Sequence, residues 1–466
     1  MLEMQESKVI RLRKGLDLPI TGRPEQRIDD AKAVPRVAII AADYLGLRPA
    51  MRVEVGQAVR RGEVLFEDKR NPGVQITSPG AGVVTAINRG ERRALISVVI
   101  ELNERERAGK PTEEDFTPFP SYTGKDIAGL SRDAIGALLL ESGLWTSFRT
   151  RPFSKIPHPN TVPHSIFVTA MDTNPLAPSV DVVLREKKES FHYGLAVIAK
   201  LTDGNVFLCK AEDSHEVSAP PHQGIKVVSF AGPHPAGTPG VHIHFLDPVH
   251  KEKTVWHIPY QEVIAIGDLF RTGRLNVERV ISLAGPSVQR PRLLRTRLGA
   301  STDTLTANEL VPGEHRVISG SVLSGRTASG EIGGYLGRYH YQISVLPEGR
   351  ERYFLGWMSP GINRFSVMPI YISRFFKNRL FKFTTNLNGG KRAMVPIGLY
   401  EKVMPMDILP TFLLRALLTN DLERAEELGC LELDEEDVAL CSFVCPSKID
   451  YGTALRHVLD TIEKEG

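Results

Sequence analysis

Cysteine is scarce in this sequence: only Cys209, Cys430, Cys441 and Cys445 occur among 466 residues. A disulfide-held fold needs more cysteines spread along the chain, so we expect neither a disulfide framework nor an oxidising compartment. Long apolar runs are also missing, since no stretch approaches the about 20 residues that a membrane-spanning helix needs. Neither sign of charge dominates, because the net charge is +3, and this gives no indication of a nucleic-acid binder.

The common motifs of nucleotide and metal enzymes are absent as well. There is no G-x-G-x-x-G, no Walker A sequence and no H-E-x-x-H, and no persuasive pair of nucleophile and base. Residues 1–10 are polar and do not resemble a secretory signal. We therefore expect a cytosolic protein, or a peripheral one that partners hold at a membrane.

Residues 10–110 are predicted to form the first of several domains, a β barrel. Residues 52–66 alternate apolar and polar side chains, as half-buried strands do, and residues 76–87 mirror them. The pattern resembles the barrel-sandwich hybrid of biotinyl and lipoyl carriers. A carrier needs a modified lysine between the halves, and Lys69 lacks the usual flanking residues, so we favour a purely structural barrel.

The remaining chain divides into three more predicted domains. Residues 126–258 alternate helical stretches with short apolar strands, which indicates a Rossmann-like α/β domain with a parallel sheet. Residues 259–378 return to strand periodicity and are expected to be β-rich. Residues 379–466 are predicted to be helical, because apolar side chains recur there at helical spacing, as at Leu455, Val458, Leu459 and Ile462.

One aromatic and basic segment follows the first predicted helix of the α/β domain. A nucleotide site would place glycines there, so that backbone N–H groups could approach phosphate. The segment instead suits a flat aromatic headgroup or a docking surface, since Trp, Phe and Arg are favoured interface anchors. Core packing with outward arginines is an equally good interpretation. The candidate residues are Trp145, Phe148, Arg149, Arg151 and Phe153.

Two polar groups in the α/β domain are weaker candidates. His242 and His244 are expected on one side of a strand, with His234 folding back toward them, but no carboxylate or thiolate completes a zinc site. We therefore expect these histidines to be structural. Asp172 follows a predicted strand, where α/β sheets place ligand-binding loops, and we favour a turn cap over a ribose ligand.

The C-terminal region carries two incomplete iron–sulfur frames. Bacterial ferredoxins bind clusters with C-x2-C-x2-C-x3-C-P, and this spacing fits twice before a proline. Two thiolates cannot close a four-cysteine site, so we expect no cluster and no metal here. The four ligand positions are Met394, Ile397, Tyr400 and Met404 in the first frame, and Glu435, Val438, Cys441 and Cys445 in the second.

Taken together, the domain order and several motifs resemble the A subunits of Na+-translocating NADH:quinone reductases. These motifs are residues 13–20, 170–176, 230–237, 316–323, 394–398 and 435–446. The resemblance covers the whole chain and implies an α+β multidomain fold. In it, 259–378 is a β-grasp, SLBB-like domain and 379–466 is a ferredoxin-like helical domain without clusters. It also implies kinship with the C subunit of the Rnf complex and with the flavin- and NADH-binding subunit of respiratory complex I.

The resemblance further implies a function for the chain. It would be a cofactor-free peripheral component of a six-subunit complex that oxidises NADH, reduces ubiquinone and exports Na+. It would lie at the cytoplasmic face of the inner membrane against the membrane-embedded B subunit. FMN, riboflavin, FAD and iron–sulfur centres would belong to partner subunits, and ubiquinone would be a possible ligand here. The alternatives are a free-standing flavin or iron–sulfur NADH dehydrogenase and a lipoyl or biotinyl carrier.

Overall fold

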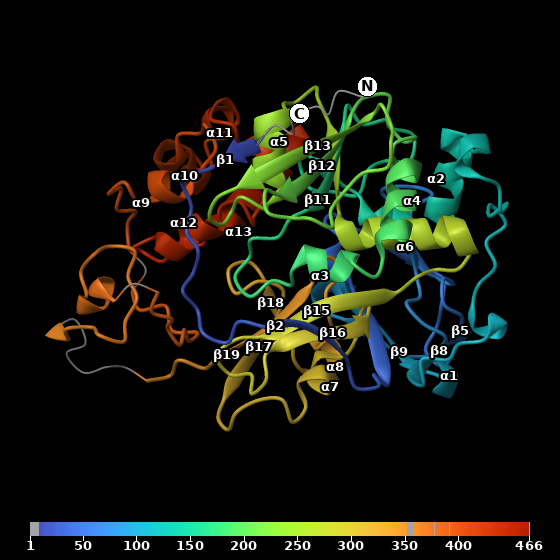
Figure 1. The fold of residues 1–466 in the computed structure, drawn as a ribbon, viewed down its shortest axis with the longest axis horizontal. Helices are drawn as coiled ribbons and strands as arrows, with labels where there is room; N and C mark the ends of the chain where they lie inside the picture. The colour runs from blue at the N-terminus through green and yellow to red at the C-terminus, as the bar shows by residue number, and fades with distance from the viewer. Residues whose placement is uncertain (1–8, 352–357, 377, 391, 466) are drawn as a thin grey trace.

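The computed structural model describes residues 9–351, 358–376, 378–390 and 392–465. Their strands form four sheets, and the chain runs through the sheets with helices on either side (Figure 1). None of the helices in these ranges is both long and apolar enough to cross a membrane.

The largest α/β unit contains a six-stranded sheet in the order β1-β13-β12-β11-β14-β10. All neighbouring pairs are parallel except β10 with β14, which confirms the predicted parallel sheet. Strand β11 is buried along its whole length, as expected when helices cover both faces. The strands are β1 (Val9–Arg11), β10 (Arg149–Arg151), β11 (Ile166–Ala170), β12 (Val206–Ala211), β13 (Ile225–Ala231) and β14 (Val255–Pro259).

Helices cover both faces of this sheet. One face of the sheet packs on a core with α4 and α6. These two helices lie so close that a Cβ added to Gly267 on α6 would be 1.8 Å from the Ser190 carbonyl oxygen on α4, and only glycine permits this approach. The other face packs against α5 and the C-terminal helices. The helices of this unit are α2 (Arg132–Glu141), α3 (Val180–Leu184), α4 (Lys188–Ile198), α5 (Pro239–Leu246) and α6 (Tyr260–Thr272).

The predicted barrel is built from two small antiparallel sheets, β3-β9-β8-β5 and β4-β6-β7. Its interior holds Val37, Leu65, Val84 and Ile100, all fully buried. Its elements are β3 (Arg36–Ile40), β4 (Pro49–Met51), β5 (Ala58–Val59), β6 (Val64–Asp68), β7 (Gln75–Thr77), β8 (Gly82–Arg89), β9 (Leu95–Leu102) and the short helix α1 (Glu104–Arg107).

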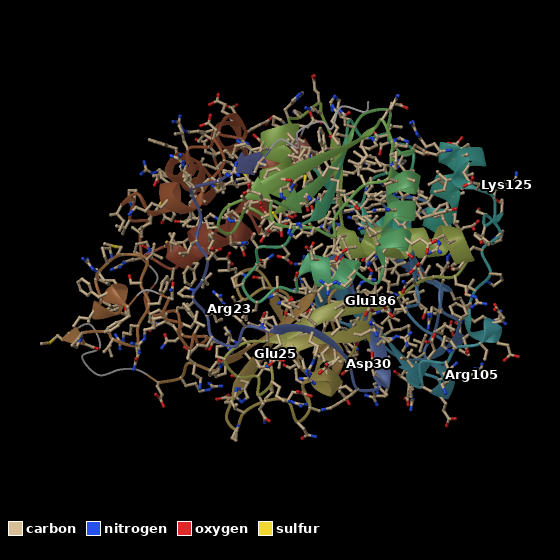
Figure 2. All side chains as sticks on the ribbon, in the orientation of Figure 1. Arg23, Glu25, Asp30, Arg105, Lys125 and Glu186 are labelled. Atoms are coloured by element: carbon tan, nitrogen blue, oxygen red, sulfur yellow. The ribbon has the colours of Figure 1, made fainter. Side chains whose placement is uncertain are left out.

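The segment before the barrel strands pairs with two other sheets. Strand β1 pairs with β13, and β2 (Glu25–Asp30) pairs with β16 (Arg292–Arg297) of the next unit. Local periodicity cannot reveal such pairing, because the partners are more than 200 residues away. Figure 2 labels Glu25 and Asp30 at the two ends of β2 and Glu186 above it. Arg295 pairs with both Asp30 (3.3 Å) and Glu186 (2.6 Å), which ties this sheet to the α/β unit.

The third unit is a mixed six-stranded sheet in the order β18-β17-β19-β15-β16-β2. The expected β-rich character of this region is confirmed, although the predicted range also took in α6, which packs on α4. Its elements are β2 (Glu25–Asp30), β15 (Glu278–Ala284), β16 (Arg292–Arg297), β17 (His315–Ser319), β18 (Arg326–Thr327), β19 (Gln342–Pro347), α7 (Thr302–Thr306) and α8 (Gly330–Gly333).

The C-terminal unit is helical, as predicted, and its described residues contain five α-helices. Leu455, Val458, Leu459 and Ile462 are all buried on the last of them. This unit shares one apolar core with α5 and with the neighbouring face of the α/β sheet. The helices are α9 (Leu399–Val403), α10 (Pro410–Thr419), α11 (Leu422–Glu427), α12 (Ala439–Val444) and α13 (Tyr451–Glu465).

Candidate functional site

Ligands of open α/β sheets usually bind at the carboxyl ends of the strands, where the strand order reverses. In this sheet the order reverses between β11 and β14, but the chain itself covers that edge. The Ser282 hydroxyl donates to the Leu176 carbonyl (2.5 Å), and the Gln342 amide donates to the Pro175 carbonyl (2.9 Å). The loop after β11 is therefore held against the third unit rather than left open for a ligand.

Asp172 begins this covered loop and caps a turn, as predicted. Its carboxylate accepts from the backbone N–H of Asn174 (2.8 Å) and from the Asn174 side chain (3.0 Å). Burial raises the pKa of Asp172 to about 6. With both hydrogen bonds made inside the turn, Asp172 serves the local backbone.

An acidic loop from the C-terminal unit fills the same carboxyl-terminal edge of the sheet. We call residues 434–437 the acidic loop. Asp437 accepts a hydrogen bond from the Thr238 hydroxyl (3.0 Å), directly before α5 begins. A Cβ added to Gly240 would lie 2.3 Å from the Asp437 carboxylate. A helix N-terminus attracts anions, and here the chain supplies the anion itself.

Three arginines bind the acidic loop. The fully buried Arg151 places Nη1 3.3 Å from Asp434 and Nη2 3.5 Å from Asp437. Arg456 on α13 lies 2.7 Å from Asp434, and Arg149 lies 3.8 Å from it. Buried charges are tolerated only when they are paired, so these contacts hold β10 and the C-terminal unit together.

The carboxylates of the acidic loop differ in charge state. Burial alone would raise the pKa of Asp434, but Arg151 and its neighbouring arginines hold that pKa well below the usual range. Burial raises the pKa of Glu436 to about 7, against the attraction of Arg149. Near neutral pH the acidic loop is therefore partly protonated, which limits the electrostatic repulsion between its carboxylates.

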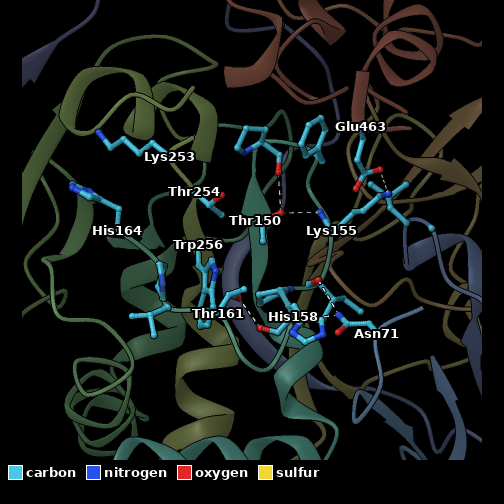
Figure 3. A pocket seen from close by; sticks show the side chains of 18 of the residues that line it. Asn71, Thr150, Lys155, His158, Thr161, His164, Lys253, Thr254, Trp256 and Glu463 are labelled. Atoms are coloured by element: carbon cyan, nitrogen blue, oxygen red, sulfur yellow. Dashed lines mark hydrogen bonds and ion pairs between the residues drawn. The ribbon is translucent and has the colours of Figure 1, made fainter. Parts of the chain in front are cut away.

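An open pocket of about 1020 Å³ lies at the opposite, amino-terminal edge of the sheet (Figure 3). Its wall is formed by the segments that precede β11, β12 and β14, by barrel loops, and by residues 150–158. Lys155 pairs with Glu463 at one side, and His164 and Lys253 lie at the other (Figure 3). The pocket thus joins three units and carries both aromatic and basic side chains.

Trp256 is the aromatic centre of this wall. Its indole N–H is buried and has no hydrogen-bond partner within the described residues, which leaves an unpaired donor beside the pocket. Trp145 packs edge-on against it at 5.3 Å and Phe148 at 5.5 Å. Trp256 was not among the predicted residues, because one tryptophan in a short strand carries no motif.

The five predicted site residues separate into three groups. Trp145 is 3% exposed and Phe148 is fully buried, so both lie behind Trp256 and not on the surface. Arg149 and Arg151 point to the acidic loop. Phe153 lines the pocket, together with Thr150 and Lys155. The segment therefore borders a pocket, but at the amino-terminal edge of the sheet.

The expectation that His242 and His244 share one side of a strand is wrong. Both lie on helix α5, which begins after Thr238 with a proline in its first turn. Residues two apart on a helix point in different directions. His242 contacts the Ala236 carbonyl (3.0 Å), His244 contacts Glu432 (2.8 Å), and His234 contacts Thr173 (3.1 Å).

The two incomplete iron–sulfur frames meet in space. The Tyr400 hydroxyl donates to the Cys445 sulfur (3.2 Å) and contacts the Tyr451 hydroxyl (2.8 Å). Burial alone would raise the pKa of the Cys445 thiol, but the hydrogen bond from Tyr400 leaves it below its usual value. Across the described ranges, no group of three or more His, Cys, Asp or Glu side chains is arranged to hold a metal ion.

Family models match three consecutive parts of the chain. Residues 10–103 match the NqrA N-terminal barrel-sandwich hybrid domain. Residues 130–275 match the NqrA second alpha/beta domain. Residues 280–330 match the NQRA C-terminal domain of SLBB type.

Curated relatives are similar to the chain along its whole length. The A subunit of the Na(+)-translocating NADH-quinone reductase of Cellvibrio japonicus is 55% identical over 460 residues, covering 98% of this chain and 100% of the relative. Its counterpart in Saccharophagus degradans is 56% identical over 458 residues, with the same coverage. Among solved structures, an NAD+-reducing [NiFe]-hydrogenase matches 50% of each chain at 13% identity and a TM-score of 0.35.

Proposed function

The chain belongs to the NqrA family, the A subunits of Na(+)-translocating NADH-quinone reductases, and from this membership we propose how it serves that complex. It is a subunit of a Na+-pumping NADH:quinone reductase. The observation that carries this conclusion is identity of more than half over nearly all of both chains. Within the complex, we propose that it supports assembly and the quinone-reduction end without a redox centre of its own.

The proposal extends to the surroundings of the chain in the complex. We propose a six-subunit complex in which this chain is peripheral, at the cytoplasmic face of the inner membrane beside the membrane-embedded B subunit. The flavins FMN, riboflavin and FAD and the iron–sulfur centres then lie in partner subunits. Electrons pass between those centres, and this chain shapes the place where ubiquinone is reduced.

For the chain itself we propose four domains: 10–110, 126–258, 259–378 and 379–466. The third is a β-grasp, SLBB-like domain, and the last is ferredoxin-like without clusters. The Tyr400 to Cys445 contact supports the latter assignment. In two-cluster ferredoxins the fourth cysteine of one run ligates the cluster of the other run. Tyr400 and Cys445 occupy the third position of one frame and the fourth of the other, so they meet where one cluster would have been.

Ubiquinone is the proposed ligand of the pocket beside Trp256. A quinone is a flat ring with two carbonyl acceptors, and the pocket offers an aromatic wall with an unpaired indole donor. Of the predicted set, Phe153 is the proposed direct contact. Trp145 and Phe148 support Trp256 from behind, and Arg149 and Arg151 fix the segment on the acidic loop.

Intrinsic fluorescence tests this site in the isolated chain. Adding a short-chain ubiquinone should quench tryptophan emission, because Trp256 lines the pocket. Trp256→Phe keeps the ring but removes the donor, and the dissociation constant should rise about fivefold, the effect of losing one hydrogen bond of roughly 1 kcal/mol. The dissociation constant of Trp256→Phe is best measured by calorimetry, since this variant lacks the tryptophan whose fluorescence reports binding.

Phe153→Leu should also weaken binding, and it keeps all tryptophans. Its matched control is Phe245→Leu, a partly exposed phenylalanine on α5 outside the pocket. Equal quinone affinity in Phe153→Leu, Trp256→Phe and the control would exclude this pocket. Membership in the complex would stand in that case, because it rests on the relatives.

A further inference from the structure

A second feature of the chain is unusual in both charge and exposure. Residues 352–400 contain eight Lys or Arg residues and no Asp or Glu, although the chain as a whole has 58 basic and 55 acidic residues. Such one-sided charge within an otherwise balanced chain indicates contact with an anionic surface.

Apolar side chains are exposed along the same stretch. We call residues 358–387 the arm, which extends away from the rest of the molecule at the left of Figure 1. Nine of the eighteen exposed large apolar side chains among the described residues lie in it. Phe375 is 71% exposed and Ile370 is 62% exposed. Exposed apolar groups in this density mark an interaction surface.

The base of the arm is fixed to the fold. Thr385 donates its backbone N–H to the Pro347 carbonyl (3.2 Å) and accepts at its hydroxyl from the backbone N–H of Gly349 (2.9 Å). Phe381 bridges to Ile20, and its ring lies 5.7 Å from that of Phe365. The described arm beyond this base is irregular apart from one 3-10 turn, η7 (Ile372–Phe375).

Cations and apolar groups lie side by side in η7 and the residues that follow it. The Arg374 guanidinium lies 4.7 Å from the ring centre of Phe375, and that of Arg379 lies 5.6 Å from that of Phe376. A membrane surface accepts this combination, because acyl chains take up the apolar groups while lipid phosphates bind the cations.

We propose that the arm binds the surface of an anionic membrane, with Phe375, Phe376 and Ile370 entering the headgroup region and Arg374 and Arg379 contacting lipid phosphates. A nucleic acid would need flat rings for stacking and would leave the exposed aliphatic side chains in water. An acidic protein partner would need a surface of defined complementary shape. The irregular backbone around η7 provides little surface of that kind. The proposal rests on the proposed function only in requiring that a membrane lies nearby.

Vesicle binding by the full-length chain tests the proposal without the complex. The chain should sediment with vesicles of phosphatidylcholine and phosphatidylglycerol, and about tenfold more weakly with phosphatidylcholine alone. Added salt should weaken the first interaction, since it screens the charges.

Two sets of variants separate the apolar and ionic contributions. Ile370→Ser/Phe375→Ser/Phe376→Ser should lower binding to the anionic vesicles at least about tenfold, because three apolar side chains that would enter the headgroup region are lost. Arg374→Gln/Arg379→Gln should remove most of the preference for phosphatidylglycerol. The controls are Phe412→Ser, which like Phe376 is 48% exposed but lies on α10, and Arg92→Gln/Arg93→Gln in the barrel.

A fluorescent probe at position 375 of the arm gives an independent readout. Emission of Phe375→Trp should be quenched by lipids with brominated acyl chains, whereas Phe412→Trp should not respond. The proposal is overturned if the wild type ignores both vesicle types, or if arm and control variants bind alike. It is also overturned if the arm variants keep vesicle binding but no longer rejoin membranes stripped of this protein, or if they lose only RNA binding.

Failure of the two proposals can be told apart. Loss of vesicle binding with normal quinone affinity would leave the proposed function intact. Loss of quinone affinity with normal vesicle binding would leave the arm proposal intact.

Discussion

The two edges of the central parallel sheet have opposite characters. At the carboxyl ends of the strands, where α/β folds usually bind ligands, the chain provides its own anion, its own arginines and the covering third unit. At the amino ends, a pocket of about 1020 Å³ stays open. In this chain, the edge that usually binds ligands is filled by the chain itself, while the opposite edge keeps an open pocket.

We call the carboxyl-terminal edge of the sheet the closed edge and the amino-terminal edge the open edge. The stability of the closed edge should depend most on Arg151. Replacing Arg151 by Met leaves Asp434 and Asp437 buried with fewer partners, and we expect the free energy of unfolding to fall by about 3–5 kcal/mol. Urea denaturation followed by circular dichroism measures it. Arg27→Met, at an exposed pair with Asp29, is the control and should change stability by less than about 1 kcal/mol. A similar small loss for Arg151 would show that the edge is closed by something else.

Packing at the start of α5 offers a second way to disturb the closed edge. A methyl group at position 240 would collide with the Asp437 carboxylate, so Gly240→Ala should cost about 1–3 kcal/mol. Gly129→Ala is the matched change, because nothing lies within 4 Å of its added Cβ. Thermal unfolding compares the two, and equal melting temperatures would contradict the described docking of the acidic loop.

The charge state of the acidic loop gives a smaller, pH-dependent effect. The pKa of Glu436 is about 7 in the folded chain and about 4.3 when unfolded, so between these values the folded state binds more protons. Stability should therefore fall as pH rises through this window. Glu436→Gln should stabilise the chain by about 1 kcal/mol at pH 8 and have little effect near pH 4.

Denaturation at the two pH values checks this prediction. Glu104→Gln, at an exposed carboxylate, serves as the control and should affect both conditions alike. A Glu436→Gln variant that is destabilised at pH 8 would mean that the charged carboxylate contributes a favourable ion pair.

Substitutions at the open edge should change the free energy of unfolding least. Lys155 and Glu463 are both partly exposed, so Lys155→Gln and Glu463→Gln should each change the free energy of unfolding by less than about 1 kcal/mol. This contrast with Arg151 is the sharpest measure of how the two edges differ. A loss above about 2 kcal/mol at Lys155 would make the pocket wall as structural as the closed edge.

Local patterns predicted the elements well. Residues 165–170 and 225–230 form parallel strands, and Leu455 and Ile462 face the core, because strand and helix periodicity act over a few residues. The histidines at 242 and 244 were misplaced because Val-His-Ile-His alternates like a strand although it follows a helix start. Apolar alternation cannot distinguish a strand from a helix when the first turns of the helix are buried, as in α5.

Contacts between distant segments could not be predicted. The pairing of Arg151 with Asp437 joins residues 286 positions apart, and no local pattern connects them. The same holds for the strands β1 and β2, which leave the barrel for other sheets. Among the five predicted residues of the aromatic segment, Phe153 lines the pocket, and which edge of the sheet stays open depends on what the third and last units cover.

The tied base of the arm has a consequence for how the chain can vary. Since Pro347 and Thr385 are hydrogen-bonded to each other, the fold is already closed beneath the arm. Insertions or deletions beyond that point change the closure entropy only slightly, because it grows with the logarithm of loop length. Changes in the length of the arm should therefore leave the stability of the sheet on which it is mounted nearly unchanged.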